Sequence, residues 1–264
     1  MDKKVIIGII LVILAAIIIV YAVNGNSTKD DKLYQVSLMQ SFMQGGYEGF
    51  VTVGDLKTHG DTGLGTFDSV NGEMILLDGV VYQAKSDGSI NVMQDNETIP
   101  FATVTQFDCD DKISEFSAKD FDNLTTHLND EIKKYGTNKI YVAKIDANCK
   151  NITVRSIVKQ EKPYIEFTKV AAKDQIVFNY TNQNGTLIAI YFPEYMDKLN
   201  MHGWHLHFLS KDKTKGGHVL NLTDANANGE LDEINEFDMV TPNTDSFNGV
   251  NLNENMTDKI HSVE

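Results

Sequence analysis

Cysteine, proline and repeated or low-complexity tracts are scarce in this sequence. The 264 residues include four prolines and two cysteines, and we find no repeat of solenoid or propeller length. These absences argue against a collagen-like chain, a long disordered chain and a repeat scaffold. Apolar residues make up 42% of the chain, which is enough for a sizeable core. We therefore expect a globular protein of one or two domains.

Cys109 and Cys149 lie too far apart in the sequence for a zinc ribbon, and no catalytic cysteine signature surrounds either of them. If the chain folds outside the cytoplasm they could form a disulfide, and two free thiols are equally compatible with the sequence.

Positive charge is also scarce. The chain has 23 lysines and arginines against 37 aspartates and glutamates, which gives a net charge of -14. An acidic surface repels the phosphate backbone, so we expect no nucleic-acid partner.

The N-terminus carries one long uncharged apolar run, residues 5–23. As a helix with a rise of about 1.5 Å per residue it would span roughly 28 Å, close to the thickness of a bilayer core. Lys3 and Lys4 precede it and predict that this end stays in the cytoplasm. Its length favours an uncleaved membrane anchor over a cleaved signal peptide. Either way, we expect an extracytoplasmic protein, membrane-anchored or secreted, with residues 24–32 as a polar linker.

The rest of the chain has the pattern of an α+β fold. Helical spacing of apolar residues occurs over residues 33–43 and 117–135. Asp78-Gly79 and Asn184-Gly185 are dipeptides typical of β-hairpins. Strands are predicted over residues 50–53, 74–77, 80–84, 101–107, 139–145, 152–158, 175–180 and 186–192.

A polar break at residues 160–163 suggests two subdomains. We expect a mixed β-sheet in an N-terminal subdomain, residues 33–160. The C-terminal subdomain, residues 161–264, should be mainly antiparallel β-structure and carry a metal site.

Three histidines predict that metal site. His205 and His207 flank Leu206, so on a strand both imidazoles point to one face. The polar residues 211–217 are typical of a hairpin loop, which would bring His218 beside His207. Cross-strand Cβ atoms lie about 5 Å apart, close enough for both side chains to bind one ion. Three neutral imidazoles leave a coordination position open, as in catalytic zinc sites.

The ligand types alone leave other interpretations open. Copper, nickel and iron(II) also accept imidazole. Histidines can also lie on a solvated strand without binding a metal.

The same hairpin also resembles a known family. Acetolactate decarboxylases have a metal-binding hairpin similar to residues 203–222 (GWHLHFLSKDKTKGGHVLNL). Residues 59–83 (HGDTGLGTFDSVNGEMILLDGVVYQ) are similar to the family's N-terminal segment. Residues 154–164 (VRSIVKQEKPY) and 185–195 (GTLIAIYFPEY) match as well. The resemblance runs in order over residues 33–264.

The resemblance implies decarboxylation of acetolactate to acetoin and carbon dioxide. It implies that His205, His207 and His218 hold Zn²⁺, and that the zinc stabilises the enediolate left when carbon dioxide departs. Glu73 matches an active-site glutamate that handles a proton or positions substrate. Arg155 matches an arginine that engages the substrate carboxylate, for which its planar fork is suited.

Two further residues follow from the same resemblance. Thr66, in the GLGT motif, matches a threonine that lines the family's pocket. Glu264 matches a glutamate near the family's C-terminus that approaches the metal. The resemblance also implies a homodimer.

Two alternatives belong to other functional classes. A cupin-like metal-dependent oxygenase or isomerase also uses an H-x-H strand, although the glutamate that follows in that pattern is missing between Phe208 and Gly217. A non-catalytic, membrane-tethered module would use the histidines only to bind metal.

Overall fold

The structure, a computed structural model, describes residues 31–263. The predicted membrane segment, its linker up to residue 30, and Glu264 lie outside these residues. No helix within the described part of the chain is long and apolar enough to cross a bilayer.

One β-sheet has seven strands in the order β14-β1-β8-β3-β4-β5-β6. β1 is parallel to β14, and all the other neighbours are antiparallel, so the sheet is mixed, as predicted. A separate short pair consists of β2 (Val51–Thr52) and β7 (Thr98–Ile99). The seven strands are β1 (Lys32–Val36), β3 (Thr62–Thr66), β4 (Glu73–Leu77), β5 (Val80–Ala84), β6 (Ile90–Val92), β8 (Phe101–Thr105) and β14 (Glu236–Val240).

The second sheet is antiparallel and strongly curved. β10 pairs with both β11 and β13, while β12 pairs with β11 and with the start of β13, so these four strands close on themselves. β9 extends the sheet beside β13. Its strands are β9 (Asp111–Asp120), β10 (Ile140–Ile157), β11 (Gln175–Phe192), β12 (Gly203–Ser210) and β13 (Gly216–Ile234).

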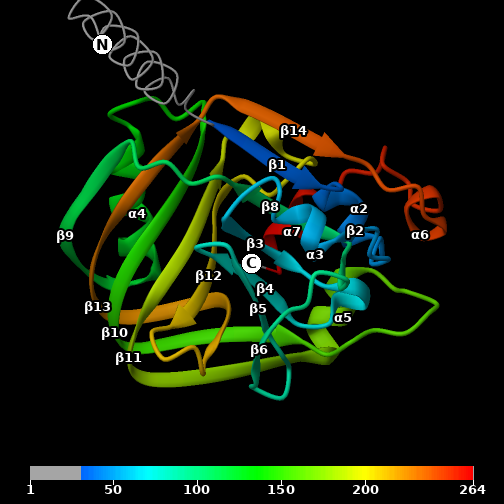
Figure 1. The fold of residues 1–264 in the computed structure, drawn as a ribbon, viewed down its shortest axis with the longest axis horizontal. Coiled ribbons are helices and arrows are strands. Elements are labelled where there is room, and N and C mark those ends of the chain that lie inside the picture. Colours follow the sequence, from blue (N-terminus) through cyan, green and yellow to red (C-terminus); the bar gives the residue numbers. More distant parts are fainter. Residues whose placement is uncertain (1–30, 264) are drawn as a thin grey trace, which may run out of the picture. The chain divides into compact units, whose positions relative to one another are not determined.

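Helix α4 (Phe121–Ile132) lies in the hollow of the long strands (Figure 1). Its apolar face, Leu124, Leu128 and Ile132, is completely buried in a core shared with β10 and β13. The predicted helix began earlier, at residue 117. The structure instead uses Asp120 as the N-cap, whose side chain accepts a hydrogen bond from the Asn123 amide at 2.9 Å.

The remaining helices are short. α2, α5 and α7 share one apolar core that covers one end of the space between the two sheets. These helices are α2 (Met39–Met43), α3 (Val53–Leu56), α5 (Phe167–Asp174), α6 (Asp245–Asn248) and α7 (Thr257–His261), with 3-10 turns η1 (Asp68–Val70) and η2 (Glu194–Met196).

The two sheets do not divide the chain at residue 160. β9 and β10 come before this position and belong to the curved sheet, whereas β14 comes after it and joins the seven-stranded sheet. Strand pairing is non-local, so a polar break in the sequence does not have to separate two sheets. The described residues, 31–263, form one compact unit.

Two local predictions are wrong. The predicted helix over residues 33–43 is the strand β1 followed by α2, because β1 lies between β14 and β8, where Leu33 and Val36 are fully buried. Asn184-Gly185 is not a hairpin turn but lies inside β11. A Cβ on Gly185 would lie 2.4 Å from the Leu209 carbonyl oxygen, so this glycine permits close strand packing. The Asp78-Gly79 hairpin is confirmed between β4 and β5, with both residues at positive φ.

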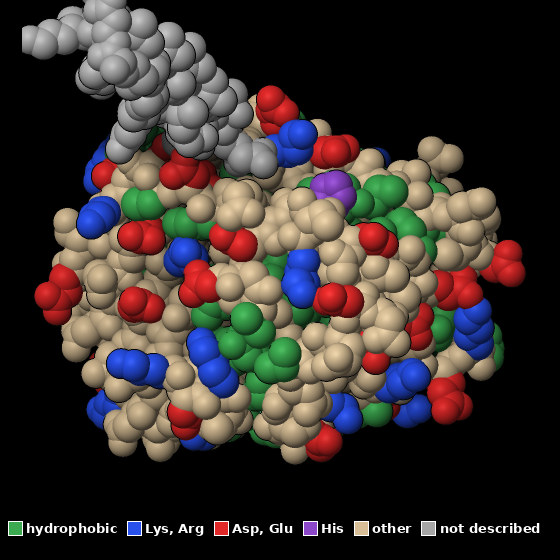
Figure 2. Space-filling view, viewed as in Figure 1, with side chains coloured by type: hydrophobic (Ala, Val, Ile, Leu, Met, Phe, Trp, Pro, Cys, Tyr) green, Lys and Arg blue, Asp and Glu red, His purple; other side chains and the backbone are tan. Residues whose placement is uncertain are grey.

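The face of the molecule in Figure 2 carries acidic and basic side chains interspersed. It shows no continuous basic surface of the kind that binds a phosphate backbone.

Candidate metal centre and active site

The β12–β13 hairpin positions the histidines. In its loop, the Asp212 carboxylate accepts hydrogen bonds from the Ser210 hydroxyl at 2.6 Å and from the Thr214 amide and hydroxyl at 3.1 and 2.8 Å. These donors lower the pKa of Asp212 to about 2. The ionised Asp212 carboxylate therefore stabilises the turn of the hairpin. In the two strands that the turn joins, His207 lies directly opposite His218.

His205, His207 and His218 converge on one point. One nitrogen from each ring lies within 4.8 Å of the others, and their exposed fractions are 8%, 1% and 2%. His205 Nε2 is 2.9 Å from His218 Nδ1. The predicted juxtaposition is therefore present, on a buried face rather than on a solvated strand.

The ring of His207 is oriented by the opposite sheet. Its Nδ1 lies 2.8 Å from the carbonyl oxygen of Met74 in β4. A carbonyl can only accept, so Nδ1 donates the proton, and Nε2 is left as the nitrogen that could bind a metal ion. Three buried imidazoles, one of them fixed in this way, fit a divalent ion that accepts nitrogen ligands.

Glu73 reaches the same point from the seven-stranded sheet. It is the first residue of β4, it is 7% exposed, and its Oε2 lies 3.7 Å from His207 Nε2. A carboxylate and three imidazoles therefore meet between the sheets.

Arg155 lies beside the histidines in β10, where it pairs with His218 of β13. It is 4% exposed. Its Nη1 donates to the side-chain oxygen of Gln175 at 3.3 Å and to the backbone carbonyl of Val263. The guanidinium carbon lies 5.6 Å from the centre of the Phe167 ring, within the range of a cation–π interaction.

Thr66 also lines this pocket, at the end of β3. Its hydroxyl donates to the carbonyl oxygen of Gly72 at 2.7 Å and is thus used to hold the β3–β4 turn.

Apolar side chains complete the pocket. They come from α2, α5, β8 and the β3–β4 turn, and they leave a cavity of about 30 Å³. Most of this wall consists of Met39, Phe42, Met43, Val70, Phe101 and Phe167, and Val263 also lines the pocket.

Comparison with known proteins identifies the family that has this arrangement. A family model described as alpha-acetolactate decarboxylase matches residues 33–254. The chain is 38% identical to the alpha-acetolactate decarboxylase of Brevibacillus brevis, over 92% of this chain and 84% of that protein. The chain belongs to the alpha-acetolactate decarboxylase family.

Other members of the alpha-acetolactate decarboxylase family agree. The protein of that name from Methanosarcina mazei is 37% identical over 90% of this chain and 82% of its own length. The crystal structure of the Bacillus subtilis alpha-acetolactate decarboxylase superposes with a TM-score of 0.83 at 30% identity, covering 88% of this chain and 99% of that one. The predicted fold class is confirmed, and membership of this family argues against a cupin-like enzyme.

The structure thus brings together six of the seven residues singled out from the sequence, and Glu264 lies outside the residues described. The apolar wall and Gln175 were not predicted from the sequence. Met, Phe and Val in these segments have the same pattern as core residues, so no signal in the sequence distinguishes a pocket wall from a core. Both cysteines are free thiols in the structure, Cys109 exposed and Cys149 buried.

Proposed function

We propose that this chain decarboxylates acetolactate to acetoin and carbon dioxide in the pocket between the two sheets. The observation that carries this proposal is the convergence of three buried histidines with Glu73 and Arg155 in a member of the alpha-acetolactate decarboxylase family.

We assign His205, His207 and His218 as the ligands of a zinc ion. Zinc suits a set of neutral nitrogen donors, and three protein ligands are usual where a metal takes part in catalysis. When bound, the metal supplies a Lewis acid that stabilises the negative charge developing on the substrate's ketone oxygen.

Arg155 is assigned to the substrate carboxylate. A buried guanidinium forms charge-assisted hydrogen bonds with such a group, and no other lysine or arginine lines this pocket in the described residues. The Val263 carbonyl accepts from Nη1 in this structure, so the carboxylate would replace this backbone acceptor. Arg155 then orients the carbon–carbon bond to the carboxylate, which breaks when carbon dioxide leaves.

We assign Glu73 to the protonation step that follows decarboxylation. Loss of carbon dioxide leaves a carbon that must be protonated, and the Glu73 carboxyl is held at the histidine side of the pocket, where a carboxyl group can deliver a proton to that carbon. Thr66 and the apolar wall shape the remaining space and exclude water from it.

Two measurements on the purified protein test this function. Elemental analysis should find about one zinc per chain, as three converging ligands predict, and a colorimetric assay should detect acetoin when acetolactate is added. Bound metal without acetoin would instead support a non-catalytic metal-binding module. Iron together with oxygen uptake would support the cupin-like alternative.

We also propose that the protein is extracytoplasmic and tethered by residues 5–23. The apolar run with Lys3 and Lys4 before it supports this location. In cells, the chain should sediment with membranes and be cleaved by protease added from outside. A chain found only in the cytoplasmic fraction would contradict the proposal.

A homodimer is the assembly that the family resemblance supports. Light scattering of purified protein should give twice the chain mass of 29.5 kDa, and a single chain mass would contradict it.

A further inference from the structure

The turn between β3 and β4 holds two residues in a strained backbone conformation. Ser69 has φ 61° and Val70 has φ 53°, both in the left-handed region. A β-branched residue at positive φ is an outlier, since its Cβ crowds the backbone there. Such conformations persist only where the surrounding structure enforces them, and they cluster at functional sites.

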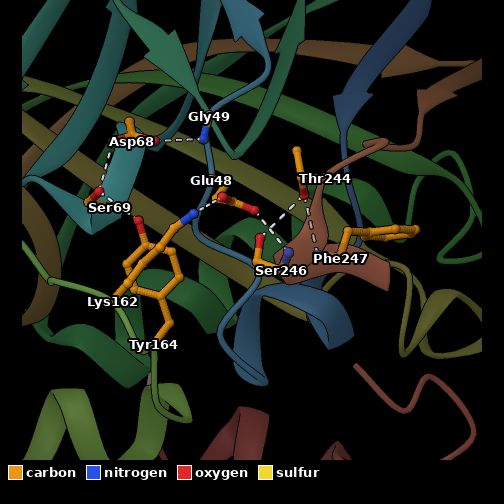
Figure 3. A network of polar contacts seen from close by, with 9 residues as sticks. All are labelled: Glu48, Gly49, Asp68, Ser69, Lys162, Tyr164, Thr244, Ser246 and Phe247. Carbon is orange, nitrogen blue, oxygen red and sulfur yellow. Dashed lines mark hydrogen bonds and ion pairs between the residues drawn. The ribbon is translucent and has the colours of Figure 1, made fainter. Parts of the chain in front are cut away.

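Polar contacts hold this turn from outside the pocket (Figure 3). The two oxygens of Asp68 accept from the Gly49 amide at 2.8 Å and from the Ser69 hydroxyl at 2.7 Å. The Ser69 hydroxyl also lies 2.9 Å from the hydroxyl of Tyr164. The Ser69 amide donates to the Tyr47 carbonyl at 2.8 Å. Two segments distant in the sequence, around residues 47–49 and at Tyr164, therefore fix this turn.

The segments on either side of the turn are tied to each other as well. Lys162 forms an ion pair with Glu48, and the second oxygen of Glu48 accepts from the Ser246 amide at 2.9 Å (Figure 3). The residues that hold Ser69 thus belong to a connected network and not to independent loops.

This arrangement of contacts fixes the position of the Val70 side chain. Its side chain is 1% exposed and lines the pocket together with Phe42, Phe101 and Phe167. The wall around Val70 is closely packed, so adding or removing one methyl group there changes the space beside the substrate.

We propose that Val70 is a specificity-determining residue, which limits the alkyl groups of the substrate to short ones. This inference rests on the proposed function. With the carboxylate at Arg155 and the oxygens at the histidines, the alkyl groups of a branched 2-hydroxy-3-oxo acid are left to face the apolar wall. Val70 is the member of that wall held by the strained turn, so its isopropyl group cannot retreat to admit a longer chain.

Enzyme kinetics with two substrates test the proposal. The first is acetolactate, and the second has an ethyl group in place of the methyl on the carbon that bears the hydroxyl. Val70→Ala should raise the ratio of kcat/KM for the ethyl compound over acetolactate about tenfold, the usual discrimination for one methylene in an apolar pocket. Val70→Ile keeps a β-branched residue and should lower the same ratio.

Val104→Ala is the matched control. Val104 is also completely buried, but it lies in the core of the seven-stranded sheet and does not line the pocket. This variant should lose stability and keep the wild-type ratio. A merely structural role of Val70 would likewise leave the ratio unchanged, and would not make it move in opposite directions in two variants.

Binding of unreactive acids separates this proposal from the proposed function. Calorimetry would compare α-hydroxy acids with a methyl or an ethyl branch, which lack the keto group and cannot lose carbon dioxide. The binding preference should shift with Val70 in the same directions as the kinetic ratio. Wild-type protein that makes no acetoin would overturn the proposed function, and calorimetry would still report on Val70. If the wild type makes acetoin but the ratio of kcat/KM for the two substrates changes by less than about twofold in both Val70 variants, only the proposed role of Val70 is overturned.

Discussion

The His207 ring in the curved sheet donates its Nδ1 proton to the Met74 carbonyl oxygen in the seven-stranded sheet, at 2.8 Å. Met74 follows Glu73, so one strand supplies both the acceptor that orients a metal ligand and the carboxylate beside it. The packing of the two sheets therefore sets the geometry of the metal centre. Since the three histidines come together only in the folded chain, binding of a metal ion to them would be coupled to folding.

Replacement of a metal ligand tests this coupling. His205→Ala should abolish both stoichiometric metal binding and acetoin formation, because two imidazoles seldom retain zinc. It should also remove the rise in Tm that added zinc gives the wild type, since a ligand stabilises only a state that binds it. Elemental analysis and thermal unfolding with and without a chelator measure both effects.

His202→Ala is the matched control for that experiment. His202 precedes β12, its side chain is 37% exposed, and its Nδ1 lies 3.3 Å from Asp197. This variant should keep its metal and its activity. Equal metal loss in both variants would show that the effect is not specific to the cluster.

Arg155→Ala should separate binding of metal from catalysis. Removing the guanidinium takes away the charge-assisted contact to the substrate carboxylate, which we expect to cost roughly 2–4 kcal/mol of transition-state stabilisation by analogy with oxyanion donors. The metal content should stay at the wild-type level, because Arg155 is not a ligand. Arg155→Lys should restore only part of kcat/KM, since an ammonium lacks the planar fork. Wild-type turnover in the alanine variant would exclude Arg155 from catalysis.

The histidine cluster could be predicted from the sequence because it follows from local rules. Side chains alternate along a strand, so His205 and His207 share a face, and a polar loop returns His218 to His207. The Asp78-Gly79 hairpin was predictable for the same reason, since both residues tolerate positive φ.

The strand at residues 33–36 and the pocket wall could not be predicted from the sequence, because both depend on contacts between distant segments. Nothing local shows that residues 33–36 form a strand in the middle of a sheet, because burial on both faces hides the alternation of polar and apolar residues. The strain at Val70 is likewise imposed by Tyr164 and Gly49 through Ser69 and Asp68, and a valine in isolation would not adopt it. Pocket walls of this kind become visible only when the sheets are assembled.

The Glu48–Lys162 pair should make stability depend on pH. Hydrogen bonds from Lys162 and the Ser246 amide lower the pKa of Glu48 to about 2 from its ordinary 4.5. A carboxyl with a lowered folded-state pKa stabilises the fold fully above its unfolded pKa, and this contribution is lost as the pH falls toward 2. Glu48→Gln should therefore reduce the free energy of unfolding by about 1 kcal/mol at neutral pH, because Lys162 is largely exposed and the pair is screened.

Urea denaturation over a pH series measures this difference. The gap between wild type and Glu48→Gln should be full at neutral pH and should narrow as the pH falls below 4.5. Glu97→Gln, a substitution at an exposed glutamate, serves as the control and should show no such trend. A gap that stays constant down to low pH would mean that ionised Glu48 does not stabilise the fold.

Thiol labelling distinguishes the two states of the cysteines that the sequence left open. Cys109 is exposed, whereas Cys149 is 0% exposed and lies in the core between α4 and the curved sheet. Burial raises the pKa of the Cys149 thiol to about 11, and since the thiolate is the reactive form, this side chain should resist alkylation. Without any reductant, iodoacetamide should label native protein at Cys109 alone, and Cys149 should react only after unfolding in urea. Cys109→Ser should leave the native protein unlabelled. Protein that remains unlabelled even in urea, until a reductant is added, would instead contain a Cys109–Cys149 disulfide.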